Sequence, residues 1–244
     1  MGVLQGSVLS PVLFSIFINN IIDDLRQHNQ GVHFAGKRFP ALLFADDIAL
    51  LAGSSYEMAG TIEHLRAFEV KWKCVISTSK SLILTPLPAL WSQIGGLNTC
   101  NKARYLGVIF SSKPSSWTAH LDKALATAKL KARRLIDAGC TLGGVDMSIN
   151  LEFIRRIVEP AYDYAAEMLP LNHKSIYHIN QFHQWLFFKW FGLTVPYGNI
   201  QLVRDEFGMA EPKTTWYKKK LLFFNKIRGL PNCNATAWIF HQNE

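Results

Sequence analysis

Residues 41–52 read Ala-Leu-Leu-Phe-Ala-Asp-Asp-Ile-Ala-Leu-Leu-Ala, and this stretch decides the fold of the N-terminal half. Two short apolar runs, residues 41–44 and 48–52, lie on either side of Asp46 and Asp47. Apolar runs of this length predict a β-hairpin with the two carboxylates at its tip. Adjacent carboxylates on a tight turn suit Mg²⁺, which prefers oxygen ligands. The alternative is an ordinary solvated turn.

Two helices are expected around this hairpin. The first runs from Ser10 to about Arg26, because Ser10 can cap free amides and Pro11 is suited to the first helical position. Its apolar residues recur at helical spacing and form one stripe that we expect to pack on other elements: Leu13, Phe14, Phe17, Ile18, Ile21 and Leu25. A second amphipathic helix is expected from Tyr56 to Trp72. Short strands around 81–85 and 104–110 would complete a mixed α and β half.

The pattern becomes helical after Trp117. Helices are predicted over 117–138, 147–158, 173–191 and 213–228. We expect breaks at the Gly-Gly pair 143–144 and at the prolines: Pro160, Pro170, Pro196, Pro212 and Pro231. This change of class predicts a division of the chain near residue 112.

The charge of the chain is distributed unevenly. Lys and Arg number 26 against 18 Asp and Glu, but residues 1–60 hold only three basic and five acidic side chains. The remaining 23 basic and 13 acidic side chains therefore give the later part its positive charge. Such a surface suits a polyanionic partner, because Lys and Arg displace counterions from a phosphate backbone. A solubilising surface is the alternative.

The clearest basic element is the helix that follows Trp117. It carries five cationic side chains against Asp122 and Asp137: Lys123, Lys129, Lys131, Arg133 and Arg134. Phosphate contacts from such a helix would position a nucleic acid without reading its sequence. The alternative is a solvated helix face. The later run of three lysines at 218–220 is assigned no ligand, because it adjoins an apolar stretch typical of a packed helix.

The sequence predicts neither zinc nor a membrane span. Its four cysteines, at 74, 100, 140 and 233, form no Cys-x-x-Cys pair, and Cys233 with His241 lacks further ligands. His173, His178 and His183 recur every five residues, which places neighbours about 140° apart on a helix. They therefore do not share a metal-binding face. No apolar run reaches the roughly 18–20 residues that cross a bilayer, and no signal peptide is recognised. We expect an intracellular protein of the cytosol or nucleus.

Four motifs in order resemble the reverse transcriptases of non-LTR retrotransposons and, more distantly, of group II introns. Residues 2–14, Gly-Val-Leu-Gln-Gly-Ser-Val-Leu-Ser-Pro-Val-Leu-Phe, are similar to the family's Q-G-S-x-L-S-P-x-L-F motif. Residues 44–47, Phe-Ala-Asp-Asp, are similar to its aromatic-Ala-Asp-Asp turn. Residues 77–80, Ser-Thr-Ser-Lys, resemble its Asn-x-x-Lys segment with Ser in place of Asn, and residues 105–107, Tyr-Leu-Gly, resemble its primer-grip hairpin.

The resemblance implies roles for these residues. Asp46 would be a catalytic ligand of Mg²⁺ or Mn²⁺ and Asp47 its less demanding neighbour. In two-metal catalysis one ion activates the primer 3′-hydroxyl and the other stabilises the leaving pyrophosphate. The remaining assignments are residues near template and incoming nucleotide, namely Gln5, Gly6 and Phe44, and the primer-grip residues Leu106 and Gly107. Lys80 would face a triphosphate or else be a solvated cation, and Gln5-Gly6 could be an ordinary turn.

The family places another strand, which bears the other essential Asp, before the Gln-Gly motif. Here only Met1 precedes Gly2, and Asp23 and Asp24 lie at the end of a later helix. We therefore expect the isolated chain to be incompetent as a polymerase. We also expect the hairpin to expose an unpaired edge and apolar surface.

Together these inferences predict an α+β protein in three parts. Residues 1–112 would be a partial reverse transcriptase palm, with a β-hairpin and a small antiparallel sheet, and residues 113–170 a helical thumb-like region. Residues 171–244 would form a helical C-terminal region without an assigned role. The implied function is an RNA-directed DNA polymerase segment that uses an RNA template, a DNA primer and dNTPs. The alternative is a non-catalytic retrotransposon remnant that acts at most as a nucleic-acid-binding module.

Overall fold

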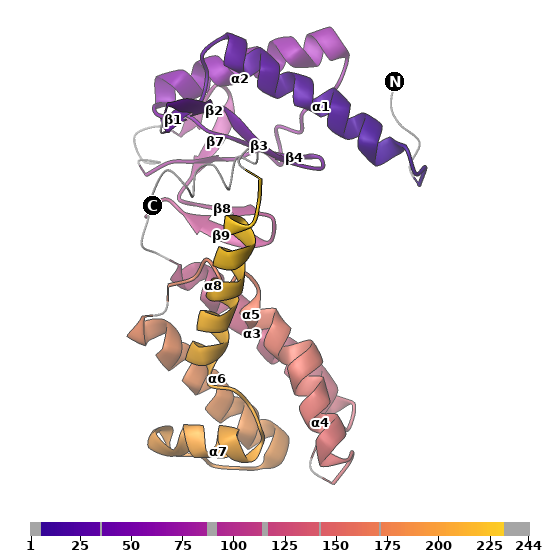
Figure 1. The fold of residues 1–244 in the computed structure, drawn as a ribbon, viewed down its shortest axis with the longest axis vertical. Coiled ribbons are helices and arrows are strands. Elements are labelled where there is room, and N and C mark those ends of the chain that lie inside the picture. Colours follow the sequence, from indigo (N-terminus) through magenta and orange to yellow (C-terminus); the bar gives the residue numbers. More distant parts are fainter. Residues whose placement is uncertain are drawn as a thin grey trace. The chain divides into compact units, whose positions relative to one another are not determined.

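The computed structural model describes residues 6–34, 36–86, 92–113, 117–141, 143–170 and 172–231. The chain divides into two compact units, Met1–Ser115 and Ser116–Glu244. The first unit mixes helices with small sheets and the second is mainly helical (Figure 1). The predicted order, α+β followed by helices, is thus confirmed at this level.

The first unit contains two long helices and nine short strands within the described residues. Their bounds are α1 (Ser10–Gln27), β1 (Val32–Phe34), β2 (Lys37–Phe39), β3 (Ala41–Phe44), β4 (Asp47–Leu50), α2 (Ser55–Trp72), β5 (Ile83–Leu84), β6 (Gln93–Ile94), β7 (Leu97–Cys100), β8 (Lys102–Tyr105) and β9 (Val108–Ser111). Three antiparallel pairs, β1–β2, β3–β4 and β8–β9, form separate two-stranded sheets. The remaining sheet has the order β5-β7-β6, and β5 pairs with β7 in parallel. The predicted small antiparallel sheet thus agrees with the other strand pairs, whereas the parallel pairing of β5 with β7 differs from it.

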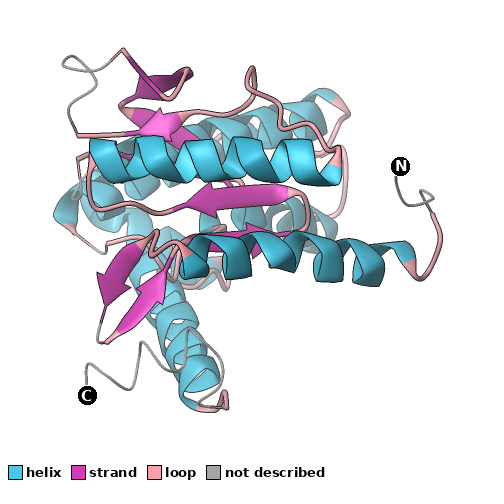
Figure 2. Ribbon diagram, turned by 90° about the horizontal axis from the view of Figure 1, so that it is seen from above, coloured by secondary structure: helices cyan, strands magenta, loops and turns pink. Residues whose placement is uncertain are grey.

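The helices α1 and α2 lie side by side in this unit (Figure 2). α1 begins at Ser10 as predicted, but Leu9 occupies the N-cap position and no side chain caps the helix. The expected cap by Ser10 is thus wrong, because Ser10 is already the first helical residue. α2 is capped by Ser54, whose hydroxyl accepts from the amide of Glu57 at 3.1 Å.

Two small cores hold the first unit together. In one, Ile21 of α1 packs with Leu65 and Phe68 of α2. In the other, Ile62 of α2 packs with Ile83 and Ile94 from the β5-β7-β6 sheet. α2 therefore contributes to both cores and links the two layers of small sheets through opposite ends of its buried stripe.

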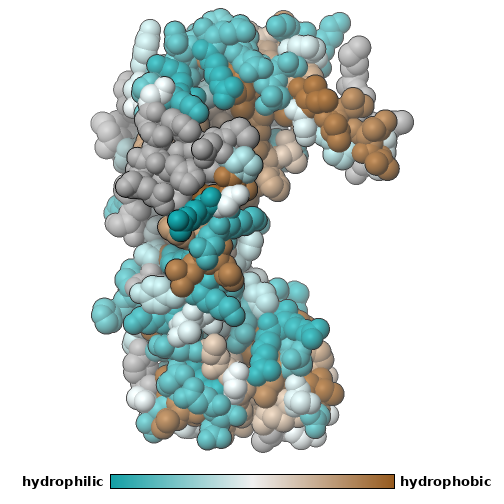
Figure 3. Space-filling view, in the orientation of Figure 1, coloured by the Kyte–Doolittle hydropathy of each residue, from teal (hydrophilic) through white to brown (hydrophobic). Residues whose placement is uncertain are grey.

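The beginning of α1 leaves a large apolar surface uncovered by the described residues. Its exposed apolar side chains are Val8, Leu9, Val12, Leu13 and Ile16. They gather at the start of α1, in brown in Figure 3. Only the C-terminal half of the predicted stripe is buried, with Ile21 and Leu25 almost fully enclosed.

The second unit is built from six α-helices, one π-helical segment and one short 3₁₀ turn among its described residues. Their bounds are α3 (Thr118–Asp137), α4 (Met147–Phe153), the π-helix Ile154–Val158, α5 (Glu159–Asp163), α6 (His173–Phe191), the 3₁₀ turn Tyr197–Asn199, α7 (Ile200–Glu206) and α8 (Pro212–Arg228). One continuous core joins α3 to α6 and α8 and contains Trp190 and Trp216. The predicted thumb-like region and the predicted C-terminal region thus share a core. None of the described helices in either unit is both long and apolar enough to span a bilayer.

The helical path around Pro160 differs from the prediction. The helix does not break before this proline but widens into the π-helix and then continues as α5. Proline has no amide hydrogen and its ring clashes with the carbonyl four residues earlier, so the wider π turn accommodates it. The amide of Glu159 accordingly bonds the carbonyl of Ile154, five residues back.

A buried polar cluster occupies the centre of the second unit. Arg204, 2% exposed, donates from Nε to Nδ1 of His183 at 2.9 Å and from Nη2 to Oδ1 of Asn180 at 2.7 Å. Because Nδ1 of His183 accepts, its proton is on Nε2, which donates to the hydroxyl of Tyr162 at 3.0 Å. Burial, and then the nearby Arg204 charge, hold the pKa of His183 well below its ordinary value. His183 is therefore a neutral, packed histidine.

Candidate active site

The carboxylate turn is a two-residue connection between β3 and β4. These strands are antiparallel, and Phe44 lies opposite Asp47 in their register. The connection consists of Ala45 and Asp46, and Ala45 has a φ of 50°. A positive φ at the first turn residue matches the right-handed twist of the strands, although a side chain there costs about 1–2 kcal/mol. The predicted hairpin is thus confirmed, with Asp46 in the turn and Asp47 as the first residue of β4.

The two faces of this hairpin have different roles. Leu43, Ile48 and Leu50 share one face and pack against the core formed by α1 and α2. Phe44 and Asp47 lie on the opposite face, because side chains alternate along a strand. Phe44 is 61% exposed, and Asp46 and Asp47 are also exposed. The helix pair therefore anchors the hairpin from one side and leaves its carboxylates on the open side.

The hairpin exposes the edge and apolar surface that the sequence led us to expect. Among the described residues, β3 and β4 pair only with each other. Leu42, on the same face as Phe44, is 49% exposed. The open face of the hairpin thus combines apolar side chains with a carboxylate.

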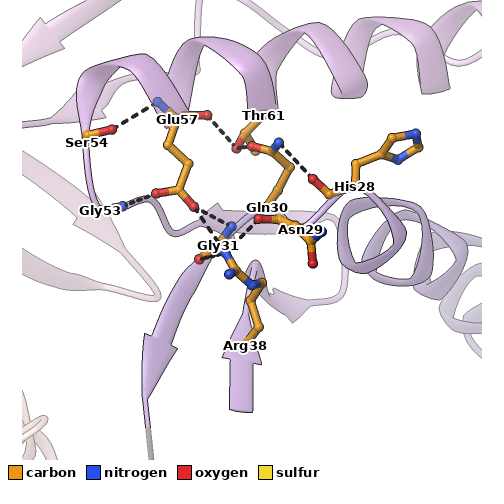
Figure 4. Close-up of polar contacts among 9 residues, drawn as sticks. All are labelled: His28, Asn29, Gln30, Gly31, Arg38, Gly53, Ser54, Glu57 and Thr61. Atoms are coloured by element: carbon orange, nitrogen blue, oxygen red, sulfur yellow. Dashed lines mark hydrogen bonds and ion pairs between the residues drawn. The ribbon is translucent and has the colours of Figure 1, made fainter. Parts of the chain in front are cut away.

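Glu57 fixes both ends of the hairpin, and sequence reasoning missed it. Its Oε2 accepts from the amide of Gly53, just after β4, at 2.7 Å, and its Oε1 accepts from the amide of Gly31 at 2.9 Å (Figure 4). Gly31 lies against Pro40, which precedes β3; a Cβ at Gly31 would stand 2.3 Å from the Pro40 Cα. The signal in the sequence was the Ser-x-x-Glu pattern of a capping box, Ser54 to Glu57.

Further hydrogen bonds extend this cluster to β2 and to the end of α1. Arg38 lies 3.8 Å from Glu57 Oε1 and donates to the carbonyls of Asn29 at 2.6 Å and Gly31 at 3.1 Å. The hydroxyl of Thr61, which is fully buried, donates to Oε1 of Gln30 at 2.9 Å. One carboxylate and its neighbours thereby connect α1, α2, the β1–β2 hairpin and the carboxylate hairpin (Figure 4).

The predicted primer-grip hairpin lies next to the carboxylate hairpin. The Tyr105 hydroxyl donates to the carbonyl of Leu42 over 3.5 Å. Burial raises the pKa of Tyr105, and the nearby negative charge of Asp47 raises it further. Leu106 and Gly107 form the two-residue turn from β8 to β9, with φ of 48° and 82°. Positive φ at both positions defines the type I′ turn, which explains the glycine by backbone geometry alone.

The carboxylates of Asp46 and Asp47 have the chemistry of ligands for a hard cation. Their exposed carboxylates form no ion pair or side-chain hydrogen bond with other described residues, so their oxygens are available. Oxygen ligands suit Mg²⁺, which keeps several waters and takes other ligands from substrate phosphates. However, no group of three or more metal-ligating side chains in the described part of the chain includes either aspartate. The carboxylate chemistry of these two residues fits such an ion, and no third ligand among the described residues joins them.

Three other residues were predicted to lie near the template or nucleotide: Gln5, Gly6 and Lys80. Gly6 is exposed, and a Cβ added to it would meet no atom within 4 Å; Gln5 lies outside the described residues. Lys80 is exposed at the end of a turn, where its amide bonds the carbonyl of Ser77 at 3.2 Å. Ser77, which stands where the family has Asn, thus organises this turn through its backbone.

The basic helix α3 presents its five predicted cations in two groups. Lys129 and Arg133 lie over the ring of Trp185 in α6, at 5.4 Å and 5.6 Å from its centroid. The other three, Lys123, Lys131 and Arg134, fall within about 80° of one another around the helix. Lys123 and Arg134 are exposed and Lys131 is half-buried. The second group, Lys123, Lys131 and Arg134, does not pack against Trp185.

Other residues noted in the sequence have structural partners in the second unit. His120 is buried and donates from Nε2 to the carbonyl of Tyr164 at 3.3 Å. His178 lies 3.2 Å from Asp122. In the lysine run, Lys219 pairs with Asp163 at 3.0 Å and Lys220 donates to the carbonyl of Glu167 at 2.8 Å. Lys219 and Lys220 are half-buried, whereas the apolar stretch that follows them, residues 221–224, is exposed. The interpretation of this run as the exposed side of a packed helix is therefore wrong for these two lysines.

Comparison with known proteins identifies the class to which this arrangement belongs. A family model described as reverse transcriptase (RNA-dependent DNA polymerase) matches residues 1–110. These residues, which contain the carboxylate hairpin and the β8–β9 hairpin, belong to the reverse transcriptase family. The match confirms the resemblance that the motifs indicated.

A curated relative of the chain is a mobile-element protein. The chain is 26% identical over 192 residues to the RNA-directed DNA polymerase from mobile element jockey of Drosophila funebris. The alignment covers 74% of this chain and 20% of the relative. The chain therefore spans about one fifth of the length of that relative. The chain is a distant homologue of a non-LTR element polymerase, and the similarity extends beyond the residues that match the family model.

Proposed function

We propose that the chain is a segment of an RNA-directed DNA polymerase that contributes one carboxylate arm to nucleotidyl transfer. The observation that carries this proposal is the hairpin with Asp46 and Asp47 exposed at its tip, anchored on α1 and α2, within residues that match the reverse transcriptase family. The substrates would be a DNA primer on an RNA template, and dNTPs.

The proposal assigns roles to three residues of the carboxylate hairpin and to the neighbouring turn. Asp46, and less critically Asp47, would hold Mg²⁺ or Mn²⁺ through carboxylate oxygens. When bound, two such ions activate the primer 3′-hydroxyl and neutralise charge on the leaving pyrophosphate. Phe44, on the open face beside Asp47, offers an apolar surface to a base or sugar. The adjoining turn of Leu106 and Gly107 would hold the primer backbone.

A second candidate, a nucleic-acid-binding module without catalysis, is favoured by one observation. No third metal-ligating side chain of the described residues joins Asp46 and Asp47. We therefore expect this chain by itself to bind an RNA–DNA hybrid without extending the primer. The two candidates share the binding step and differ in nucleotide incorporation.

The binding step is tested by affinity for an RNA–DNA hybrid as a function of salt. We expect affinity to fall as salt increases, because phosphate contacts release counterions. Replacing Lys123, Lys131 and Arg134 with alanine together should reduce the slope of log affinity against log salt by about 1 per residue removed. The matched control is Lys129→Ala with Arg133→Ala, whose side chains stack on Trp185. Equal effects of the two sets, or affinity independent of salt, would contradict the assignment.

A further inference from the structure

A second cluster of metal-ligating side chains lies between α1 and α2. Asp24, His28 and His64 each place one potential ligand atom within 4.8 Å of the others. Among the described residues this is the one group of three or more such side chains that meets this distance. It contains neither Asp46 nor Asp47 and offers nitrogen as well as oxygen ligands.

The two helices hold the three side chains at fixed backbone positions. Asp24 and His28 are four residues apart at the end of α1, so they lie on the same side of the helix. Leu25, which follows Asp24 in the sequence and is fully buried, anchors this turn of α1 in the interior. Thr61 of α2, three residues before His64, bonds Gln30 at 2.9 Å. The cluster is thus flanked by contacts that set the spacing between α1 and α2.

The hydrogen bond of His28 prepares one of its ring nitrogens to bind a metal. Its Nδ1 lies 2.8 Å from the backbone carbonyl of Asp24. Because a carbonyl only accepts, Nδ1 carries the proton and Nε2 keeps its lone pair. Metal-binding histidines typically donate their other ring nitrogen to a carbonyl or carboxylate in this way. Figure 4 shows the ring of His28 beside the Glu57 cluster and pointing away from it.

The two imidazoles are already close together. The ring centroids of His28 and His64 are 4.1 Å apart and the ring planes are tilted by 33°. Ligand atoms of a tetrahedral zinc ion with bonds of about 2.0–2.1 Å are about 3.4 Å apart. Atoms within 4.8 Å reach this spacing by side-chain rotation, for which the exposed His28 has room.

We propose that Asp24, His28 and His64 bind a borderline divalent transition-metal ion of the Zn²⁺ class and thereby link α1 to α2. Two imidazole nitrogens and one carboxylate select Zn²⁺ or Co²⁺ over Mg²⁺, which prefers oxygen ligands alone. Water completes the fourth position. The ion serves as a structural clamp between the end of α1 and α2.

This proposal differs from the expectation of no zinc that the sequence suggested. That expectation considered ligands close together in sequence, whereas His64 lies 36 residues after His28. Only the packing of α1 on α2 brings them together. The inference does not depend on the proposed polymerase function, because it concerns other residues and another class of ion.

The test is Co²⁺ binding to the full 244-residue chain with excess Mg²⁺ present to occupy oxygen-only sites. We expect the visible absorption of four-coordinate Co²⁺ and its loss on addition of Zn²⁺. His64→Ala, His28→Ala and Asp24→Asn should each weaken Co²⁺ affinity by more than about 100-fold, beyond the roughly 10–100-fold effect of losing an outer-shell residue. His33→Ala, an exposed histidine of β1, is the matched control and should leave the spectrum unchanged.

Circular dichroism of the metal-free variants shows whether they fold. For a folded His64→Ala chain, we expect Zn²⁺ to raise the thermal midpoint less than it raises that of the parent chain. If His64→Ala fails to fold, His64→Gln takes its place, with the same loss expected. Co²⁺ affinity unchanged in all three ligand variants, or a spectrum typical of six-coordinate Co²⁺, would overturn the proposal.

Discussion

The two units of the chain differ in how completely they enclose their cores. The second unit has one continuous core that includes Trp190 and Trp216, each almost fully buried. The first unit has two cores of three buried residues each among those described, and it exposes the start of α1. The unit that carries the carboxylate turn is therefore the less enclosed one. The carboxylate turn lies on a small scaffold held by a few specific polar contacts, whereas the helical unit is held by extensive packing.

The largest effect should come from emptying the core of the second unit. Trp216→Ala removes a fully buried ring and its 2.9 Å hydrogen bond to Asp163, and should cost about 3–5 kcal/mol of the free energy of unfolding of that unit. Denaturant unfolding followed by tryptophan fluorescence measures this, because five of the seven tryptophans follow residue 116. Tyr217→Ala, at a 49% exposed position, is the control and should change stability little. Similar costs for both variants would mean that this core is not continuous.

A smaller loss of stability is expected when Glu57, which holds the first unit through its hydrogen bonds, is replaced. Glu57→Ala leaves the amides of Gly31 and Gly53 without their partner and should cost about 1–3 kcal/mol. Hydrogen exchange at these two amides should accelerate, and the carboxylate hairpin should exchange faster with them. Glu63→Ala, an exposed acid of the same helix, is the control. Unchanged protection at Gly31 and Gly53 would show that Glu57 does not hold the hairpin.

The second unit should lose stability in mild acid. The unfolded chain takes up a proton at His183 near pH 6.5, whereas burial and Arg204 keep the folded residue neutral. The free energy of unfolding should therefore fall as the pH drops below about 6.5, by up to about 1.4 kcal/mol per pH unit. Burial, and then Asp163, raise the pKa of Glu159 above 4.5, which gives a contribution of opposite sign as the pH falls through that raised value.

His183→Gln separates these contributions. The variant should flatten the pH dependence of the thermal midpoint between pH 7.5 and pH 5.5, and it should be somewhat less stable at neutral pH. A Glu159→Gln chain should keep the slope that begins near pH 6.5. If His183→Gln retains the full slope, another group is responsible for it.

The smallest predicted effect concerns the carboxylate turn. Ala45→Gly relieves a positive φ of 50° and should stabilise the first unit by about 0.5–1 kcal/mol, after the entropy cost of glycine is included. Thermal unfolding of the first unit measures it. Ala49→Gly in β4 is the control and should destabilise, because glycine weakens a strand interior. Destabilisation by both would mean that the turn carries no strain.

Local patterns in the sequence predicted the elements but not the contacts that hold them. The hairpin at residues 41–50 and helix α2 follow from short apolar runs and helical spacing. The β1–β2 hairpin was missed because its strands have three residues each and carry charges such as Lys37 and Arg38. Helix α7 was missed because it has only seven residues. Such short elements are stabilised by tertiary packing rather than by their own periodicity.

The candidate site shows the same limit. Asp46 and Asp47 are recognised from adjacent residues, whereas Glu57 acts through amides that lie 26 residues before it and four before it. The division of the α3 cations depends on Trp185, which lies in another helix. The Ser54-to-Glu57 pattern could have indicated the local role of Glu57, but its contact with Gly31 and the contacts with Trp185 join residues far apart in the chain and have no signal in a single sequence.

Primer extension by the chain itself tests the central claim most directly. The claim is that Asp46 and Asp47 form a reverse transcriptase turn that supplies one side of a two-metal site. With an RNA template, a DNA primer, dNTPs and Mg²⁺ or Mn²⁺, we predict hybrid binding but no extension above the level of Asp46→Ala. Template-directed extension by the 244-residue chain that is lost in Asp46→Ala, and retained in the Asp23→Ala control, would contradict the claim.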